Sequence, residues 1–292
     1  MRGGMSTETT RTSAAVVVLY HPEPDTVQNI LSWSGQVGKV YVVDNSEPPA
    51  YDLARSLDAI DNLMYLPQDG NKGVATALNI GAGLALRDGF EWLLTMDQDS
   101  RAAPGHVAGL LKCLSGREHQ SVAILAPFPS LRSHQESALS GCREVNLVIT
   151  SGSLLNLQSY VALGPFWDEL FIDYVDNEYC LRAKSGGYKV IQCYDVTLTH
   201  NLGDIRSYRY LGRTIYNSNH NWMRRYYITR NRLFVVRKYK KLFPGICTGM
   251  LGEFRGEIKG IILFEEDKIR KLRMMVKGWT DYLLGRMGRL SD

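Results

Sequence analysis

Apolar and polar positions alternate in blocks along the first half of the chain. Short apolar runs that stop at Asn, Asp, Gly or Pro predict buried strands, and amphipathic stretches between them predict helices. The predicted strands are residues 14–20, 39–44, 62–66, 90–96 and 122–127, and the predicted helices are residues 25–33 and 74–87. Strands that alternate with helices are typical of a parallel sheet covered on both faces and joined by right-handed crossovers.

The pattern changes after residue 140. The elements predicted there are strands over residues 144–150, 188–193 and 196–199, a short helix over 176–185, and long basic helices over 224–239 and 252–285. Gly, Asn, Ser and Tyr cluster over residues 201–221, which predicts a soft boundary. The chain therefore combines an α/β part with a helical C-terminal part.

The composition is typical of a globular protein, with 45% hydrophobic and 22% charged residues among 292. This balance excludes a disordered chain, a collagen and a small disulfide scaffold. No apolar run approaches the roughly 18–20 residues that a membrane-spanning helix needs. The run over residues 14–20 ends at His21-Pro22 and is too short for a secretory signal, so we interpret it as a strand.

The cysteines carry no recognisable spacing. There are five, an odd number, and no CxxC pair occurs among Cys113, Cys142, Cys180, Cys193 and Cys247. This pattern predicts small core side chains in a reducing compartment, and we expect the cytoplasm.

Positive charge is concentrated in one segment. Residues 206–241 contain eleven of the 34 Lys and Arg and none of the 30 Asp and Glu, so the remainder has 23 basic residues and a net charge of −7. A basic segment on an acidic body indicates a localised anionic partner. From charge alone, nucleic acid, phospholipid headgroups and a diphosphate are all candidates.

Polar residues follow the predicted strands at the edge where an open parallel sheet binds ligands. These strand-end motifs are Tyr20-His21-Pro22, Asp44-Asn45, Asp69-Gly70-Asn71-Lys72-Gly73 and Asp97-Gln98-Asp99. The two carboxylates of the last motif suit Mg²⁺ or Mn²⁺, which prefer oxygen ligands. A polar turn is the alternative interpretation of such a triplet. Together the motifs fit a nucleotide with a divalent metal.

The motifs in their order resemble inverting glycosyltransferases of family 2, which have the GT-A fold, and in particular the bacterial rhamnosyltransferase branch. The resemblance rests on residues 71–81, on Met96-Asp97-Gln98-Asp99-Ser100, and on further matches along residues 14–240. Those further matches are residues 43–46, 150–153, 171–182, 200–203, 224–227 and 230–231.

The resemblance implies a domain organisation. We expect a flexible N-terminus over residues 1–13 and a GT-A catalytic domain over residues 14–221, with a mostly parallel sheet flanked by helices. Its donor half covers about 14–120 and its acceptor half about 121–221. A basic helical extension occupies residues 222–292.

The implied activity is transfer of L-rhamnose from dTDP-β-L-rhamnose to a hydroxyl of a bacterial surface glycan, with inversion. Another nucleotide-sugar, such as UDP-galactose or UDP-N-acetylglucosamine, and a non-catalytic nucleotide-sugar-binding protein are the alternatives. Implied partners are the donor and a glycan or lipid-linked glycan acceptor. Peripheral membrane contact on the cytoplasmic face and a homo-oligomer stay open, and nucleic acid is disfavoured.

The resemblance also implies roles on the donor side. Asp99 and Asp97 would hold the metal and diphosphate, with His200 as a further ligand, although Asp97 is also a candidate for sugar or ribose contact and His200 for a structural role. The other donor-binding candidates are Asp44 at the nucleobase, Asn71 and Gly73 in a donor loop, Asn79 in the following helix, and Arg230 near the leaving group. A turn cap for Asp44 and simple helix initiation for the loop are the structural alternatives.

On the acceptor side, inversion needs one general base beside the attacking hydroxyl. Asp176 takes the place of the family's base, and a helix N-cap is its structural alternative. This sequence has Val175 where many members have Glu. The backbone amides of Ser151, Gly152 and Ser153 are predicted to line the acceptor pocket, with a plain loop as the alternative.

The C-terminal part is predicted to be amphipathic, because apolar residues recur there at spacings of three and four. We expect it to expose Lys268, Arg270, Lys271 and Arg273 to an anionic membrane surface. A helix packed for stability or a dimer contact is the alternative.

Overall fold

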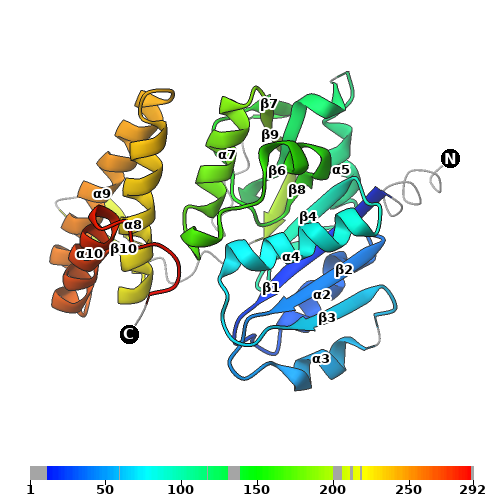
Figure 1. The fold of residues 1–292 in the computed structure, drawn as a ribbon, viewed down its shortest axis with the longest axis horizontal. Helices are drawn as coiled ribbons and strands as arrows, with labels where there is room; N and C mark the ends of the chain where they lie inside the picture. Colours follow the sequence, from blue (N-terminus) through cyan, green and yellow to red (C-terminus); the bar gives the residue numbers. More distant parts are fainter. Residues whose placement is uncertain are drawn as a thin grey trace. The chain divides into compact units, whose positions relative to one another are not determined.

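The computed structural model of the protein describes residues 12–58, 60–116, 118–130, 139–199, 206–210, 213–217 and 219–290 (Figure 1). His200 and residues 1–11 of the predicted flexible N-terminus therefore lie outside the described residues. The chain divides into two compact units. Unit 1 comprises Met1–Asp168 and Tyr179–Asn201, and unit 2 comprises Glu169–Glu178 and Leu202–Asp292. The predicted catalytic domain, residues 14–221, thus covers unit 1 and part of unit 2.

Unit 1 is built on one mixed sheet. Among the described residues it has nine strands in the order β3-β2-β1-β4-β8-β6-β9-β5, with β7 paired to β9. The bounds are β1 Ser13–Leu19, β2 Lys39–Asp44, β3 Leu63–Pro67, β4 Trp92–Asp97, β5 Arg101–Ala102, β6 Val122–Ser130, β7 Cys142–Glu144, β8 Ser153–Asn156 and β9 Lys189–Thr199. The first four strands pair in parallel, and β8 runs antiparallel between β4 and β6.

Helices cover this sheet because its central strands are apolar on both faces, as buried parallel strands are. The helices of unit 1 are α2 Thr26–Ser34, α3 Tyr51–Leu57, α4 Val74–Arg87, α5 His106–Lys112 and α6 Leu157–Leu163. Figure 1 shows α4 lying across the strands of the first half. A Cβ at Gly81 would collide with Val16, so the glycine allows α4 to pack closely against β1.

Unit 2 consists of a hairpin and three long helices. Its elements are β10 Arg206–Tyr210, β11 Arg213–Asn217, α8 Trp222–Tyr239, α9 Pro244–Phe264 and α10 Lys268–Leu283. A Cβ at Gly278 of α10 would lie 2.6 Å from the carbonyl oxygen of Tyr226, so glycine permits the close α8–α10 packing. Helix α7 (Val175–Ser185) begins in unit 2 and ends in unit 1. Within the described part of the chain, no helix is long and apolar enough to cross a membrane.

Part of the basic segment is folded inward, which the charge pattern alone does not predict. Arg225, Arg230 and Arg232 of α8 are at most 2% exposed. Arg225 donates to Glu265 at 2.7 Å, and Arg232 donates to Glu257 at 2.5 Å. The acidic partners come from α9 and its C-cap, beyond the segment itself, so Arg225 and Arg232 pair with carboxylates of the same unit instead of facing an external anion.

Three predicted elements are wrong in type or extent. Residues 145–150 form no strand, because this segment leaves the sheet after β7 and Val148 accepts from the Cys180 thiol at 3.8 Å. The strands predicted over 188–193 and 196–199 are one strand, β9, which continues through an irregularity opposite Pro127 and Phe128. The helix predicted over 252–285 is two helices, divided where Asp267 adopts a φ of 53°.

The prediction for the cysteines is wrong for two of the five. Cys113, at the C-cap of α5, and Cys142, in β7, form a disulfide. The pairing arises because β7 runs antiparallel to β9, which places Cys142 opposite Cys193. Cys113, at the end of α5, lies close to both of these cysteines. Cys180, Cys193 and Cys247 are buried thiols, as predicted.

Candidate functional site

Two carboxylates flank the end of the central strand β1 in unit 1. In the parallel register Asp44 of β2 lies opposite Leu19, and Asp97 of β4 lies opposite Val18. Because parallel strands finish at the same edge, the sheet brings these acids to the edge where open α/β sheets generally bind ligands. This is the convergence that the strand-end pattern predicts.

The middle residue of the Asp97-Gln98-Asp99 motif fixes its backbone. Gln98 Oε1 accepts from the Tyr20 amide at 2.8 Å, and Gln98 Nε2 donates to the Tyr20 carbonyl at 3.2 Å. The Gln98 carbonyl also accepts from Asn29 Nδ2 at 2.9 Å. Asp97 and Asp99 are both partly exposed. Gln98 therefore ties the end of β4 to the end of β1 and holds the segment that carries both carboxylates. The sequence pattern alone does not indicate this role for Gln98.

The Asp44 carboxylate is held by hydrogen bonds from its own turn. It accepts from the amides of Ser46 at 2.8 Å and Ala50 at 2.7 Å, and from the Tyr65 hydroxyl at 2.5 Å. Burial alone would raise the pKa of Asp44, but the hydrogen bonds from Ser46, Tyr65 and Ala50 outweigh it and hold the pKa below its usual value. Asp44 is thus ionised and occupies the turn-capping position that was the structural alternative for it.

The loop before α4 is shaped by side chains that bond to its backbone. Gly73 adopts a φ of 89°, which glycine tolerates, and its amide donates to Asn71 Oδ1 at 2.9 Å. The backbone amide of Asn71 donates to Glu47 Oε1 at 2.6 Å. Asn45 Nδ2 donates to the Gly73 carbonyl at 3.1 Å, which links the loop to the end of β2. Asn71 and Gly73 therefore lie at the strand-end edge, beside the Asp44 turn.

Asn79 of α4 has a full set of structural partners. Its Oδ1 accepts from the Tyr160 hydroxyl and the Phe166 amide, both at 2.9 Å. Its Nδ2 donates to the Phe166 carbonyl at 2.8 Å and to Asp168 at 2.9 Å. These bonds tie α4 to the segment after α6 and leave the amide engaged on both sides.

The Ser151-Gly152-Ser153 motif packs against the end of β4. Ser151 Oγ accepts from the Asp97 amide at 3.1 Å and lies 2.8 Å from Ser100 Oγ. The Gly152 amide donates to the Thr95 carbonyl at 2.7 Å, and the Ser153 amide donates to the Thr150 carbonyl at 3.0 Å. The backbone amides of Gly152 and Ser153 are therefore engaged inside the fold. The Ser151 hydroxyl supports the backbone of Asp97.

His106, which no sequence motif marks, supports the same Ser151-Gly152-Ser153 motif. Its Nε2 lies 2.8 Å from the Gly152 carbonyl, and its side chain is buried. Burial lowers the pKa of His106, so the ring is neutral near pH 7. No local signal marks a lone histidine at the start of a short helix as a partner of residue 152.

In unit 2, Asp176 lies in the first turn of α7, directly after a loop with unusual backbone geometry. Phe171, Asp173 and Tyr174 have φ values of 64°, 62° and 66°, in the left-handed region that non-glycine residues seldom adopt. Asp176 is partly buried, and its Oδ1 accepts from the Asn177 amide at 2.8 Å. Such backbone strain persists only where surrounding groups over-determine it.

Helix α8 supplies those groups. Asn231 Nδ2 donates to the carbonyls of Leu170 and Ile172 at 2.8 Å and of Asp173 at 2.9 Å. Further contacts from α8 to the loop are Arg224 to Asp173 at 2.5 Å, Arg232 to the Tyr174 hydroxyl at 2.6 Å, and Tyr227 stacked on Phe171 at 5.1 Å. We call Arg224, Tyr227, Asn231 and Arg232 the α8 clamp. It fixes the loop that leads to Asp176, a role that the sequence pattern does not indicate.

Arg230 is a buried structural cation in this arrangement. It is 0% exposed and donates to the carbonyls of Gly288 at 2.7 Å, Glu169 at 3.2 Å and Leu170 at 3.3 Å. Its guanidinium also lies against the rings of Tyr226 and Tyr227. The predicted contact with the leaving group therefore gains no support from this geometry.

Comparison with known proteins places this arrangement in a family. The profile described as "Glycosyl transferase family 2" matches residues 17–132. A curated relative, "dTDP-rhamnosyl transferase RfbF" of Shigella flexneri, is 30% identical over 241 residues, which cover 77% of this chain and 79% of the relative. The chain belongs to glycosyl transferase family 2.

Solved structures agree on the GT-A fold of this family 2 glycosyltransferase. S. aureus TarS 1-349 in complex with UDP-GlcNAc matches with a TM-score of 0.62 at 12% identity, over 93% of this chain and 80% of that chain. GalNAc-T7 with UDP, GalNAc and Mn²⁺ matches with a TM-score of 0.58 at 13% identity, over 77% of this chain and 47% of that chain. At these identities the likeness supports the fold alone.

The family profile separates the candidate residues of the glycosyltransferase into two groups. Asp44, Asn71, Asp97 and Asp99 fall inside the matched segment, residues 17–132. Asp176 and the α8 clamp fall beyond it.

Proposed function

We propose that this glycosyltransferase transfers L-rhamnose from dTDP-β-L-rhamnose to a hydroxyl of a bacterial surface glycan. Support for the donor comes from the relative named dTDP-rhamnosyl transferase and from the resemblance of the Asp97-Gln98-Asp99 segment to the rhamnosyltransferase branch. The observation that carries a catalytic function is the α8 clamp. It holds a strained loop directly before the carboxylate of Asp176, as expected where one side chain must be positioned for chemistry.

Asp176 acts as the general base in this proposal. Its carboxylate accepts the proton of the acceptor hydroxyl as that oxygen attacks the anomeric carbon and the bond to the diphosphate breaks on the opposite face. The acceptor oxygen forms one bond and the nucleoside diphosphate leaves with the electron pair of the other. A single displacement inverts the anomeric centre, so a β-linked donor gives an α-linked product.

The residues at the strand-end edge fit a divalent cation. Asp97 and Asp99 offer two partly exposed carboxylates, and Mg²⁺ or Mn²⁺ is commonly held by one or two carboxylates together with substrate phosphates. Such a cation, when bound, neutralises charge that develops on the departing diphosphate. His200 remains a proposed further ligand. Gln98 and Ser151 hold the backbone of the motif in place.

The remaining donor and acceptor candidates have different standing in the proposal. Asn71 and Gly73 stay as donor-loop residues, because they lie at the same edge as Asp44. Asp44 is proposed to present its turn to the nucleobase. Ser151, Gly152 and Ser153 stay acceptor candidates, but in an indirect role, because they support the backbone at the end of β4. Asn79 and Arg230 are given structural roles, since protein groups engage their polar atoms.

A different donor sugar on the same fold is the second candidate. The solved structure of TarS with a similar fold contains UDP-GlcNAc, and that of GalNAc-T7 contains UDP and GalNAc. A screen of released nucleotide across dTDP- and UDP-sugars separates the candidates, with the Asp176→Asn variant as the control. We expect dTDP-rhamnose to give the fastest release. Fastest release from a UDP-sugar would replace rhamnose as the donor, and no release from any donor would favour a non-catalytic binding protein.

A further inference from the structure

Helix α10 buries one face inside unit 2 and leaves a second, apolar face exposed. The inner face meets α8, and the residues buried on it are Lys271, Met275, Gly278 and Asp281. The outer face exposes four large apolar side chains: Ile269 by 69%, Val276 by 59%, Trp279 by 51% and Leu283 by 62%. We call these four residues the outer stripe. Their spacings of seven, three and four place them along one side of the helix.

An outer stripe of this kind needs a partner. Single exposed apolar residues are ordinary on soluble proteins, but several large ones aligned on one helix face are typical of an interaction surface. Trp279 lies in the stripe, and tryptophan is the residue type that favours a boundary between water and hydrocarbon. The stripe therefore suits an apolar partner with a polar edge.

The exposed charges of α10 itself are of one sign, while the acidic residues Glu266 and Asp267 lie exposed just before the helix begins. The exposed or half-exposed charged side chains of α10 are those of Lys268, Arg270, Arg273 and Lys277. Its other two charged residues are buried. Lys271 donates to Glu265 at 2.6 Å, and Asp281 accepts from the Tyr226 hydroxyl at 2.8 Å. The expectation that Lys271 faces a membrane is therefore wrong, because its ammonium neutralises a carboxylate inside unit 2.

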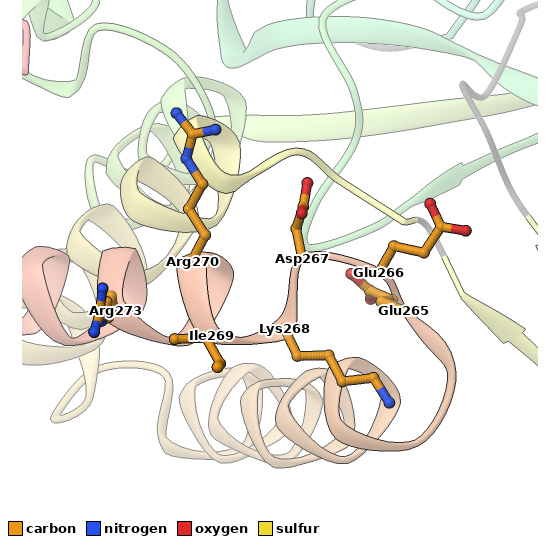
Figure 2. Close-up of a pocket in the computed structure, with 7 residues that line it drawn as sticks. All are labelled: Glu265, Glu266, Asp267, Lys268, Ile269, Arg270 and Arg273. Atoms are coloured by element: carbon orange, nitrogen blue, oxygen red, sulfur yellow. The ribbon is translucent and has the colours of Figure 1, made fainter.

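The basic side chains spread around the start of α10 instead of converging on one point. Figure 2 shows a shallow hollow where Lys268 and Arg270 extend to different sides of the helix, near Glu266 and Asp267. Arg270 also lies 4.1 Å from the ring of Trp222. This spread argues against one small anionic ligand and suits a broad anionic surface.

We propose that α10 docks on an anionic lipid bilayer, with the outer stripe in the interface and the flanking basic side chains at the lipid phosphates. An amphipathic helix that lies in the interface plane combines these two features, and long basic side chains reach the headgroups beside it. At 16 residues α10 lies on the membrane and does not span it. The inference stands without the identity of the donor sugar.

The test uses the full-length protein and co-sedimentation with vesicles of phosphatidylcholine, with and without phosphatidylglycerol. We expect binding only to the anionic vesicles and a steady loss of binding as salt rises. The double variant Val276→Ser with Trp279→Ser should weaken binding by about tenfold or more, because it removes the centre of the stripe. Trp279→Phe, which keeps a large apolar ring, should retain most of the binding.

Matched controls separate docking from a general effect of surface mutation. Leu31 and Val161 are exposed apolar residues of unit 1, at 47% and 64%, and their change to Ser should leave binding unchanged. Lys268→Gln with Arg273→Gln should weaken binding and flatten its salt dependence. Melting curves of all variants check that unit 2 stays folded.

Two results would overturn the proposal. One is equal vesicle binding by the wild type and the Val276→Ser, Trp279→Ser variant. The other is absence of vesicle binding at low salt together with a concentration-dependent mass that the same variant abolishes, which would assign the stripe to a second copy of the chain.

Discussion

Asn231 bonds directly to the backbone of Asp173: its Nδ2 donates to the Asp173 carbonyl at 2.9 Å. The same nitrogen also serves the carbonyls of Leu170 and Ile172, so one amide spans the strained loop that leads into α7. A residue in the interior of α8 thereby fixes the loop that sets the position of Asp176.

We predict that Asn231→Asp lowers kcat much more than it raises the KM for the donor. The change keeps the shape of the side chain but replaces a donor by a carboxylate that faces three carbonyl oxygens. Leaving such buried groups unsatisfied costs about 1–3 kcal/mol of stability. Initial rates per folded molecule, with folding followed by thermal melting, measure the effect.

Asn62→Asp is the matched control for that variant. Asn62 Nδ2 also donates to two carbonyls, those of Ser34 and Val37, but it belongs to unit 1, whereas the loop before α7 belongs to unit 2. It should lose stability without a specific loss of kcat. Equal kcat losses in both variants would show that the α8 clamp serves stability alone.

The hydrogen bonds of Asp44 predict a pH-dependent stability. The folded protein holds the pKa of Asp44 below its unfolded value, so the contribution is complete above the usual carboxyl range and is lost as pH falls through the folded pKa. The difference in free energy of unfolding between the wild type and Asp44→Asn should be constant near neutral pH. It should shrink below about pH 4. Urea titrations over this range measure it, and a difference that grows on acidification would contradict the assignment.

The proposed cation site predicts parallel losses in binding and activity. Asp99→Ala should weaken Mn²⁺ binding in the presence of nucleotide, read by electron paramagnetic resonance, and should lower turnover as well. Asp52→Ala removes a side chain that is 98% exposed in α3 and should change neither quantity. Full activity of the wild type in excess chelator would rule out the metal.

The disulfide between Cys113 and Cys142 closes a loop with a sequence separation of 29. Chain-entropy arguments for a loop of that length give about 3–4 kcal/mol of stabilisation. We expect Cys113→Ser to lower stability by about this amount without reductant, and dithiothreitol to reduce the wild type to a similar level. Unfolding curves with and without reductant measure both effects. Identical curves for the wild type in the two conditions would show that the bond contributes nothing.

The parts of the fold that the sequence predicts are those set by local pattern. Helix α4 begins and ends as predicted, because residues 74–87 carry a clear amphipathic period after a glycine turn. The strands that end at Asp44 and Asp97 are apolar runs stopped by polar residues, so the edge where those acids meet could be predicted as well.

The parts that it does not predict depend on partners distant in sequence. Arg225 faces inward because Glu265 lies 40 positions later, and residue-by-residue charge gives no sign of that pairing. The same holds for Cys142, which reaches Cys113 only after β7 joins the sheet edge. The strain before Asp176 also leaves no trace in the sequence, since Phe171 and Tyr174 are not residues that favour a positive φ.

The most direct test of the account is the turnover of Asp176→Asn with the donor that the nucleotide-release screen identifies. The change keeps the shape of the side chain but removes its capacity to accept the acceptor proton. We predict a fall in kcat of about 10²–10⁴-fold with nearly unchanged donor affinity, measured by calorimetry on the same preparation. Near wild-type turnover in this variant would contradict the central claim and leave Asp176 as a helix cap.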